Sequence, residues 1–252
     1  MKILVAGSND MIGAAVPHHW MVRKVLLVCG IVSSLFYVAT TIVGAMLWEG
    51  YSSTSQTVSE LFAIGAPTRP LVIPLLIIYA LLLYAFGLGI WLSAGRKHPL
   101  RIAAVLIVAK EVLGLMATVF APMHMRGSEG TISDTLHGIL TGVGVFLCML
   151  PALVFGAIAL GKRFRIYSIA TILIFVVNGV LAFLEAPQLA ADLPTPWAGV
   201  MERTNIYVYM LWIGVLAITL IRAQSDGFRL KDRDRVTHPE GAANQVRTSP
   251  NV

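Results

Sequence analysis

The residues best suited to chemistry in this 252-residue chain lie in two short stretches that resemble each other. Thr57-Val-Ser-Glu-Leu61 and Thr131-Ile-Ser-Asp-Thr-Leu-His-Gly138 each place an acid three residues after a threonine. This is the spacing of a capping box, in which the threonine oxygen accepts a backbone N–H at the start of a helix. Both stretches are therefore predicted to lie where a polar loop turns into a helix.

His137 follows Asp134 by three residues, a spacing that brings the imidazole and the carboxylate onto one face of a helix. We expect the carboxylate to fix the tautomer of the ring and to raise its basicity. Acids in the other polar loops, one of them beside an arginine, would complete an ionisable pocket suited to general acid–base chemistry. The predicted catalytic residues are His137, Asp134, Glu60 and Glu202, and the predicted substrate-binding residues are Ser59, Arg203 and His124.

The same side chains allow other interpretations. They include metal-ligating types, but no His-x-x-x-His or His-Glu-x-x-His element is present, and we predict no metal site. Ser59 with His137 as its base would form a hydrolase pair, although the Gly-x-Ser-x-Gly elbow is absent. Alternatively, the acids form only helix caps and ion pairs between loops, with His137 hydrogen-bonded between helices. The sequence leaves open whether the chain is an enzyme.

Lys110 and Glu111 form a second unusual feature, because they lie in the middle of an apolar run. Ionised groups at such a position cost about 2.5–3.5 kcal/mol each on insertion scales, so both should face the interior of a bundle. Neighbours on a helix point about 100° apart. We therefore expect each to pair with another helix, with Asn178 as a polar candidate, and either to serve ion or proton transport or to fix helix packing.

Lipid must be the solvent for much of this chain. Its residues are 57% hydrophobic and 13% charged, and its mean hydropathy is +0.78, a balance that a soluble domain of this length cannot bury. Six apolar runs are each long enough to cross about 30 Å of hydrocarbon as a helix, and they cover residues 25–48, 71–93, 102–121, 135–160, 166–184 and 204–221. They predict an all-α polytopic membrane helix bundle with six transmembrane helices.

Basic residues predict the orientation of this bundle. They gather before the first run, after the second, after the fourth and after the sixth, whereas the alternate loops hold only Arg69, Arg126 and Arg203. By the positive-inside rule both termini are cytoplasmic, and the polar loops with their acids face outward. Because the net charge of +6 recurs between apolar runs and is not gathered on one soluble face, we predict no nucleic-acid partner.

The chain divides into three predicted segments. Residues 1–23 form a cytoplasmic extension that resembles the first strand and turn of a dinucleotide-binding fold, but Asp10 stands where the middle glycine would fall and Pro17 breaks any helix. We therefore predict no nucleotide cofactor, and no other cofactor. Residues 24–222 form the six-span domain. Residues 223–252 carry charges of both signs without apolar periodicity and are predicted to be disordered.

The fourth apolar run contains packing signals of its own. Gly138 and Gly142 have the small-x-x-x-small spacing that lets two membrane helices approach closely. Pro151 should kink this helix or weaken it, because proline removes one backbone hydrogen bond.

Several of these residues carry a resemblance to a known family. Tyr51-x-x-x-Ser55-x-x-Val-Ser59-Glu60-Leu61, followed by Gly65-Ala66-Pro67, resembles the first signature of an uncharacterised prokaryotic membrane family, domain of unknown function 998. Leu136-His137 and Gly199-Val-Met-Glu202-Arg203 resemble its second and third signatures. The resemblance covers about residues 24–222. It implies six helices in a prokaryotic plasma or inner membrane, and it implies no activity.

We therefore predict an integral membrane protein whose outward-facing polar pocket binds or processes a small or lipid-like molecule. Membrane lipid and that ligand are its expected partners. The first alternative is an ion-coupled transporter that uses Lys110 and Glu111. The second is a non-catalytic membrane scaffold whose polar motifs only hold the loops in place.

Overall fold

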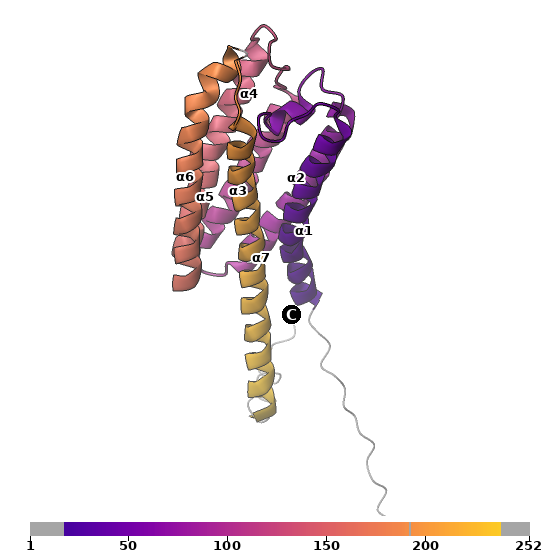
Figure 1. The fold of residues 1–252 in the computed structure, drawn as a ribbon. Helices are drawn as coiled ribbons and strands as arrows, with labels where there is room; N and C mark the ends of the chain where they lie inside the picture. Colours follow the sequence, from indigo (N-terminus) through magenta and orange to yellow (C-terminus); the bar gives the residue numbers. More distant parts are fainter. Residues whose placement is uncertain (1–17, 192, 238–252) are drawn as a thin grey trace, which may run out of the picture.

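A computed structural model describes residues 18–191 and 193–237 and shows an all-helical bundle (Figure 1). No extended strand occurs in these ranges, and the only β-type pairing among them is an isolated bridge between Ile64 and His124. The elements in chain order are α1 (His18–Leu47), η1 (Ser59–Phe62), α2 (Arg69–Ser93), α3 (His98–Val119), α4 (Ile132–Val143), η2 (Gly144–Met149), α5 (Leu150–Ala159), α6 (Lys162–Ala190) and α7 (Ala198–Thr237).

Six helical segments in the described part are long and apolar enough to cross a membrane. α1, α2, α3, α6 and α7 each supply one, and α4, η2 and α5 together form the fourth, from residue 132 to residue 159. In hydrocarbon every backbone N–H and C=O must find a partner within the protein, and a helix satisfies this requirement within one segment. The predicted all-α fold with six helices long and apolar enough to span a membrane is confirmed, whereas the side on which the termini lie stays a prediction.

The six spans close into a ring. α1 packs against α2, α2 against α3, and α3 against the segments of the fourth span. α5 then packs against α6, α6 against α7, and α7 returns to α1 (Figure 1). Each span therefore has its sequence neighbours at its sides, and the interior of the ring is reached by side chains from all of them.

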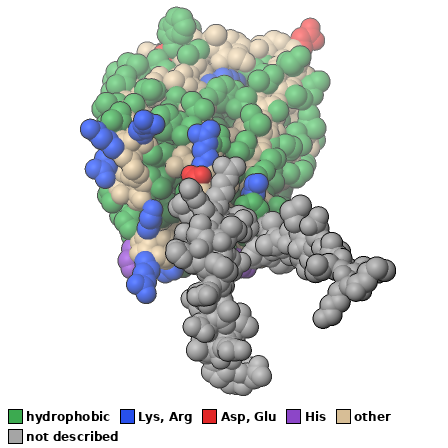
Figure 2. Space-filling model, turned by 90° about the horizontal axis from the view of Figure 1, so that it is seen from below, with side chains coloured by type: hydrophobic (Ala, Val, Ile, Leu, Met, Phe, Trp, Pro, Cys, Tyr) green, Lys and Arg blue, Asp and Glu red, His purple; other side chains and the backbone are tan. Residues whose placement is uncertain are grey.

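The two ends of the bundle differ in character. We call the end that carries the connections after α1, α3 and α6 the loop end, and the end that carries the turns 94–97 and 160–161 the basic end. Seen from the basic end, Lys and Arg side chains gather on this face, whereas hydrophobic side chains surround them (Figure 2). This distribution is the one expected where a hydrophobic flank meets a charged membrane surface.

The half of the bundle near the basic end has a close-packed apolar core. Trp212 is fully buried, and its indole N–H donates to the hydroxyl oxygen of Ser168 at 2.9 Å. Gly156 lies so close that a Cβ at this position would meet the Trp212 ring at 2.5 Å. Further buried members of this core include Leu27, Leu83, Phe86, Ile90, Leu100, Leu153, Ile213 and Leu216.

The fourth span changes its helical geometry at its centre. The six residues of η2 form a π-helix, and Pro151 follows directly, in the first turn of α5. The Pro151 ring has no N–H and would clash with the carbonyl four residues earlier in an α-helix, which explains the wider turn before it. The weakening of the fourth span that Pro151 predicts is therefore this change from α-helical to π-helical geometry. The close helix approach predicted for the glycines of this span is wrong at Gly138 and Gly142, because a Cβ at either position would meet nothing within 4 Å. It is confirmed at Gly144, where a Cβ would meet the Lys110 carbonyl oxygen of α3 at 3.6 Å.

The helix ends differ from the predicted segment boundaries. α1 begins at His18, within the predicted extension 1–23, and α7 continues to Thr237, beyond the predicted start of the tail at residue 223. Once a helix is established, each added residue gains a hydrogen bond without a new nucleus, and the sequence has no proline between Ala198 and Pro239 to stop it. The rest of the two terminal segments, 1–17 and 238–252, lies outside the described residues.

Candidate functional site

The connection between α1 and α2 folds over the loop end of the ring and covers it. Its short helix η1 buries Glu60, Leu61 and Phe62. Leu61 and Phe62 belong to a small apolar cluster with Val72 and Leu76 of α2. η1 therefore acts as a packed cover over the helix ends, with one carboxylate buried inside it.

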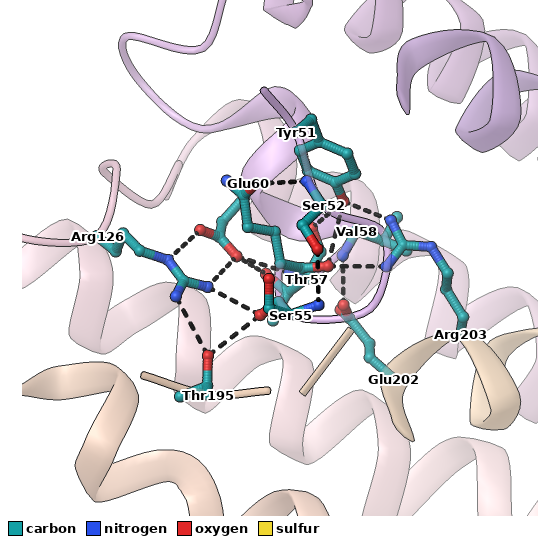
Figure 3. A network of polar contacts seen from close by, with 11 residues as sticks. Tyr51, Ser52, Ser55, Thr57, Val58, Glu60, Arg126, Thr195, Glu202 and Arg203 are labelled. Carbon is teal, nitrogen blue, oxygen red and sulfur yellow. Dashed lines mark hydrogen bonds and ion pairs between the residues drawn. The ribbon is translucent and has the colours of Figure 1, made fainter. Parts of the chain in front are cut away.

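Glu60 is held by Arg126 from the connection after α3 (Figure 3). Arg126 Nε donates to Glu60 Oε1 at 2.7 Å, and Arg126 Nη2 donates to Oε2 at 2.9 Å. Glu60 Oε2 also accepts the backbone N–H of Thr57 at 2.6 Å and the Thr57 hydroxyl at 3.1 Å. A bidentate pair of this kind holds both partners in a fixed geometry, so Glu60 is structural rather than free for proton transfer.

The local structure around Thr57 corrects part of the capping prediction. Glu60 does reach back to the Thr57 N–H, but the Thr57 hydroxyl donates to Glu60 and caps no backbone group. The helix that follows is the four-residue η1, and the second span begins only at Arg69. The capping contact predicted for Glu60 is therefore only partly formed, because the half-buried Arg126 binds the same carboxylate.

Arg126 also joins the connection after α6 to the connection after α1. Its Nη1 donates to Thr195 Oγ1 at 3.2 Å, and its Nη2 donates to the carbonyl oxygen of Ser55 at 3.1 Å. Thr195 in turn donates to the same Ser55 carbonyl at 3.1 Å. One guanidinium therefore joins the connections after α1, α3 and α6. No local sequence pattern indicates this role, although Arg126 is one of only three basic residues in the polar loops.

Arg203 fixes the same cover from the first turns of α7. Its Nη1 donates to the carbonyl oxygens of Ser53 and Gln56, both at 2.8 Å, and its Nη2 donates to the Tyr51 hydroxyl. Burial raises the pKa of Tyr51 to about 12, against the opposing effect of the Arg203 charge. A Cβ at Gly199 would collide with the carbonyls of Gln56 and Ser53, so only glycine allows this close approach.

Glu202 is the acid that remains without a cation. Its carboxylate accepts the backbone N–H of Val58 (Figure 3). It also accepts the hydroxyl of Ser59 at 3.4 Å. None of the ion pairs within residues 18–191 and 193–237 includes it. An ionised carboxylate can accept about four hydrogen bonds, so Glu202 keeps acceptor capacity for a ligand.

His137 does not pair with Asp134 as predicted. Its Nδ1 lies 3.1 Å from the carbonyl oxygen of Ala117 and 3.0 Å from that of Ala121, both near the end of α3. Carbonyl oxygens only accept, so Nδ1 carries the hydrogen and donates. The neutral ring then has Nε2 as its acceptor. The last carbonyl groups of a helix have no partner within it, and those at the end of α3 lie next to His137. They therefore accept the hydrogen bond of the ring in place of the Asp134 carboxylate, which lies one turn away.

Asp134 lies in a separate cluster on the outer edge. It completes the capping box of α4 with Thr131, as predicted, and it accepts the backbone N–H of His124 at 2.6 Å. Its Oδ2 also lies 3.1 Å from His124 Nδ1. Asp134 and His124 thus hold the connection after α3 onto the start of α4. Within the described part of the chain no group of three His, Cys, Asp or Glu side chains is placed to hold a metal ion.

A cavity of about 260 Å³ lies inside the ring, between η1 and the middle of the spans. All six spans contribute to its wall, and most of the lining is apolar. Its polar lining residues are Ser59, Glu202, His137, Asn205, Lys110, Glu111, Thr118, Thr141, Tyr37, Tyr79 and Tyr209. Of the predicted site residues, Ser59, His137, Glu202, Lys110 and Glu111 line this cavity.

The four predicted catalytic residues therefore do not form one group. His137 and Glu202 line the cavity, whereas Glu60 and Asp134 are absent from its lining and are occupied by Arg126 and by the capping cluster. Of the predicted substrate-binding residues, Ser59 lines the cavity, but Arg203 and His124 bind loops.

Lys110 and Glu111 pair with each other instead of with another helix. Lys110 Nζ lies 3.0 Å from Glu111 Oε2, and it also lies over the ring of Tyr209, 5.7 Å from the centroid. Asn178 donates to the Ile174 carbonyl of its own helix, so the expected partner is wrong. The long lysine stem bridges the angle between neighbouring helix positions, and the apolar surroundings leave Glu111 as the strongest available acceptor.

Three further polar groups belong to the cavity lining. The hydroxyls of Tyr79 and Tyr209 and the Oδ1 of Asn205 are buried without a hydrogen-bond partner among the described residues, and all three residues line the cavity. Tyr209 is 1% exposed and Asn205 is 9% exposed. Buried polar atoms without partners are uncommon and mark places where a further molecule can bind.

Comparison with known proteins gives one match. The sequence profile of the family described as "Protein of unknown function (DUF998)" matches residues 31–219. No curated protein and no solved structure matches the chain. The matched range begins within α1 and ends within α7, and it contains every residue that lines the cavity.

Proposed function

The chain belongs to the DUF998 family, and from that premise we propose that it is a membrane protein that binds a small amphiphilic, lipid-like molecule in the cavity of its ring. The observation that carries this proposal is one cavity with a mostly apolar lining, to which α4, α7 and η1 contribute the polar residues His137, Glu202 and Ser59. A concave, mostly apolar site with a few convergent polar groups is the usual form of a ligand site.

Three polar groups are suited to hold the polar part of such a ligand. Glu202 offers a carboxylate with unused acceptor capacity, and His137 offers a ring whose orientation is already fixed by two carbonyls. Ser59 offers a hydroxyl from η1. Fixed orientation lowers the entropy cost of binding, because the site does not have to order itself around the ligand.

Binding is better supported than the predicted acid–base catalysis. Two of the four proposed catalytic residues, Glu60 and Asp134, are saturated by structural hydrogen bonds. His137 and Glu202 alone would have to supply any proton transfer. We therefore assign the pair to ligand recognition.

We further propose a prokaryotic plasma or inner membrane as the location, with the basic end and both termini in the cytoplasm. The support is the distribution of Lys and Arg in the sequence, together with their gathering at the basic end (Figure 2). In this orientation the cavity lies in the outer half of the membrane.

Native mass spectrometry of the protein purified in mild detergent tests the proposed binding. The wild-type protein should retain a molecule of defined mass. Glu202→Gln, which removes the charge and keeps the shape, should weaken retention about tenfold or more, because a hydrogen bond to a charged group contributes about 1.5–3 kcal/mol. Glu129→Gln is the matched control, since it removes an exposed acid from the same end. Equal retention in the two variants would refute the assigned role of Glu202, and a wild-type protein without any bound molecule would favour the scaffold.

A carrier is the second candidate, because the ion pair of Lys110 and Glu111 lines the same cavity in the middle of the membrane. Against it stands the packed core below, where Phe86, Ile90 and Trp212 are fully buried and would have to separate. Proteoliposomes with a fluorescent-tailed phosphatidylcholine distinguish the two functions. A carrier moves this lipid between leaflets and loses that ability with Glu111→Gln, whereas a binding protein leaves the leaflet distribution unchanged.

A further inference from the structure

We propose that the ligand of the cavity is a membrane lipid with a hydroxyl- or amine-bearing headgroup, which enters sideways between α4 and α6 and leaves its acyl chain in the bilayer. This inference rests on the binding function proposed above and adds the route and the chemical class. Two sides of the cavity are closed, one at the loop end and one toward the basic end.

The loop end of the cavity is covered. Ser59 and Phe62 of η1 line the cavity from above, and the Phe62 and His137 rings lie 6.3 Å apart. η1 is fastened in this position by the bidentate bonds of Arg126 to Glu60. A water-soluble ligand would have to break this ion pair to enter from above.

The opposite end is closed by the core of the basic half. Tyr209 and Met210 line the cavity, and the next turn of α7 places Trp212 and Ile213 in a core with no exposed surface. Close-packed interiors of this kind leave no path for a molecule of ligand size.

The side wall between α4 and α6 is different. Thr141 of α4 lines the cavity and is nevertheless exposed at the surface, and Ala182 of α6 lines it and is half-buried. α4 packs against α3 and η2, whereas α6 packs against α5 and α7, and α4 with α6 is not among the helix pairs in broad contact. The cavity therefore reaches the surface of the bundle at Thr141.

The surface around Thr141 is in contact with hydrocarbon. Thr141 lies nine residues after the start of α4 at Ile132, which is about 14 Å along the helix axis and near the middle of a bilayer core about 30 Å thick. Leu181 of α6, next to Ala182, is an exposed apolar side chain. A molecule that enters here comes from the acyl-chain region.

The position of the polar groups fits a lipid headgroup. His137 and Thr141 are one helical turn apart and both line the cavity, so a headgroup beside His137 has its chain at the opening. The cavity of about 260 Å³ is smaller than the roughly 300–1,000 Å³ usual for whole drug-sized ligands. A headgroup inside and a chain outside match this size.

The chemistry of the lining selects the headgroup. Glu202 and Asn205 Oδ1 present acceptors, the Tyr209 hydroxyl is unpartnered among the described residues, and the one cation in the lining, Lys110, is already paired with Glu111. Donor groups such as hydroxyls or amines satisfy these acceptors, whereas a phosphate beside Glu202 would meet like charge. The predicted ligand is therefore a neutral or amine-bearing lipid.

Photolabelling in vesicles tests this inference. The protein is reconstituted in phosphatidylcholine vesicles that contain a diacylglycerol with a diazirine close to its ester group, and the labelled residues are identified by peptide mass spectrometry. We expect adducts on buried lining residues such as Phe175 and Met149, which annular lipid cannot reach. A phosphatidic acid with the same diazirine chain should give about tenfold fewer of these adducts, since about 1.4 kcal/mol corresponds to a factor of ten.

Two variants test the route. Thr141→Trp should obstruct the opening and lower the adduct yield on Phe175 about tenfold, by the same conversion. Ile139→Trp is the matched control, since Ile139 is exposed on the same helix and does not line the cavity, and its adduct yield should equal that of the wild type. Both substitutions lie on the exposed surface and should leave the fold intact. Circular dichroism and gel filtration verify this before labelling.

The outcomes separate this inference from the proposed function. Equal labelling by the two lipids overturns the headgroup assignment, and equal yields from the two tryptophan variants overturn the route. If a water-soluble diazirine amino acid labels Phe175 and the lipids do not, the cavity binds ligands but not from the membrane. If neither probe labels the lining residues, the proposed binding function fails together with the inference.

Discussion

The two halves of the bundle are built on different physical principles. Near the basic end, aromatic and aliphatic side chains interlock around Trp212, and small residues such as Gly156 allow helices to approach. Near the loop end, the helices are joined by hydrogen bonds and by the Glu60–Arg126 ion pair, and they enclose a cavity. One half is held mainly by close packing, and the other by a polar network around a cavity.

This difference indicates that the loop half can change its structure while the packed basic half keeps the protein folded. In lipid there is little hydrophobic drive between helices, so tight packing must supply the association energy. The basic half supplies it, which leaves the loop half able to keep a cavity and unpartnered polar atoms such as the Tyr209 hydroxyl, which has no partner among the described residues. The predictions below test this division, beginning with the largest expected effect.

Arg126→Ala should destabilise the loop half most. It leaves the carboxylate of Glu60 buried without its cation, which costs about 3–5 kcal/mol for a buried pair. The measurement is the free energy of unfolding in an SDS titration. Replacing both partners, Glu60→Leu with Arg126→Leu, should recover much of the loss, because two apolar groups leave no buried charge. If the single variant is as stable as the wild type, the polar network does not hold this half together.

Trp212→Ala should cause the largest loss in the basic half. It removes the packing against Gly156 and the hydrogen bond to Ser168. The loss should be about 2–4 kcal/mol, toward the lower part of the range for soluble cores, because lipid is as apolar as the interior. Trp91→Ala is the control, since Trp91 is 43% exposed. A similar loss in both variants would contradict a packed core centred on Trp212.

Gly199→Ala should loosen the cover over the cavity. The new Cβ collides with the carbonyls of Ser53 and Gln56, and overpacking of this kind costs about 1–3 kcal/mol. Limited proteolysis of the connection after α1, together with the melting temperature, measures the effect. Gly214→Ala, on the same helix with nothing within 4 Å of the new Cβ, should be neutral or slightly stabilising. Indistinguishable proteolysis of the two variants would show that the contact with α7 does not hold the cover.

Asp134→Ala should have the smallest effect and separates the edge of the loop end from its cavity. It removes the capping box of α4, at a cost of about 1 kcal/mol. Ligand retention in native mass spectrometry should stay unchanged, because Asp134 is absent from the cavity lining. Reduced retention, with the fold intact, would place Asp134 in the binding site after all.

The residues of the site show how far sequence patterns reach. The Thr131–Asp134 spacing predicted a capping box, and the structure contains one, because such a box involves only neighbouring residues. The same reasoning paired His137 with Asp134, whereas its ring is held by carbonyls of α3, sixteen and twenty residues away along the chain. For Glu60, the decisive partner was Arg126, which no local pattern connects with it.

The sequence by itself determined that this chain forms six long apolar helical segments and roughly where each lies, although α1, α6 and α7 extend beyond the predicted runs. Helix formation and hydropathy depend on neighbours along the chain, so they can be summed over a window. Only the tertiary structure decided which polar groups face the common cavity. It separated Glu202 and His137 from Glu60 and Asp134, and it added Asn205 and Tyr209. That choice depends on which helices become neighbours in the ring and on which acceptor lies nearest each donor.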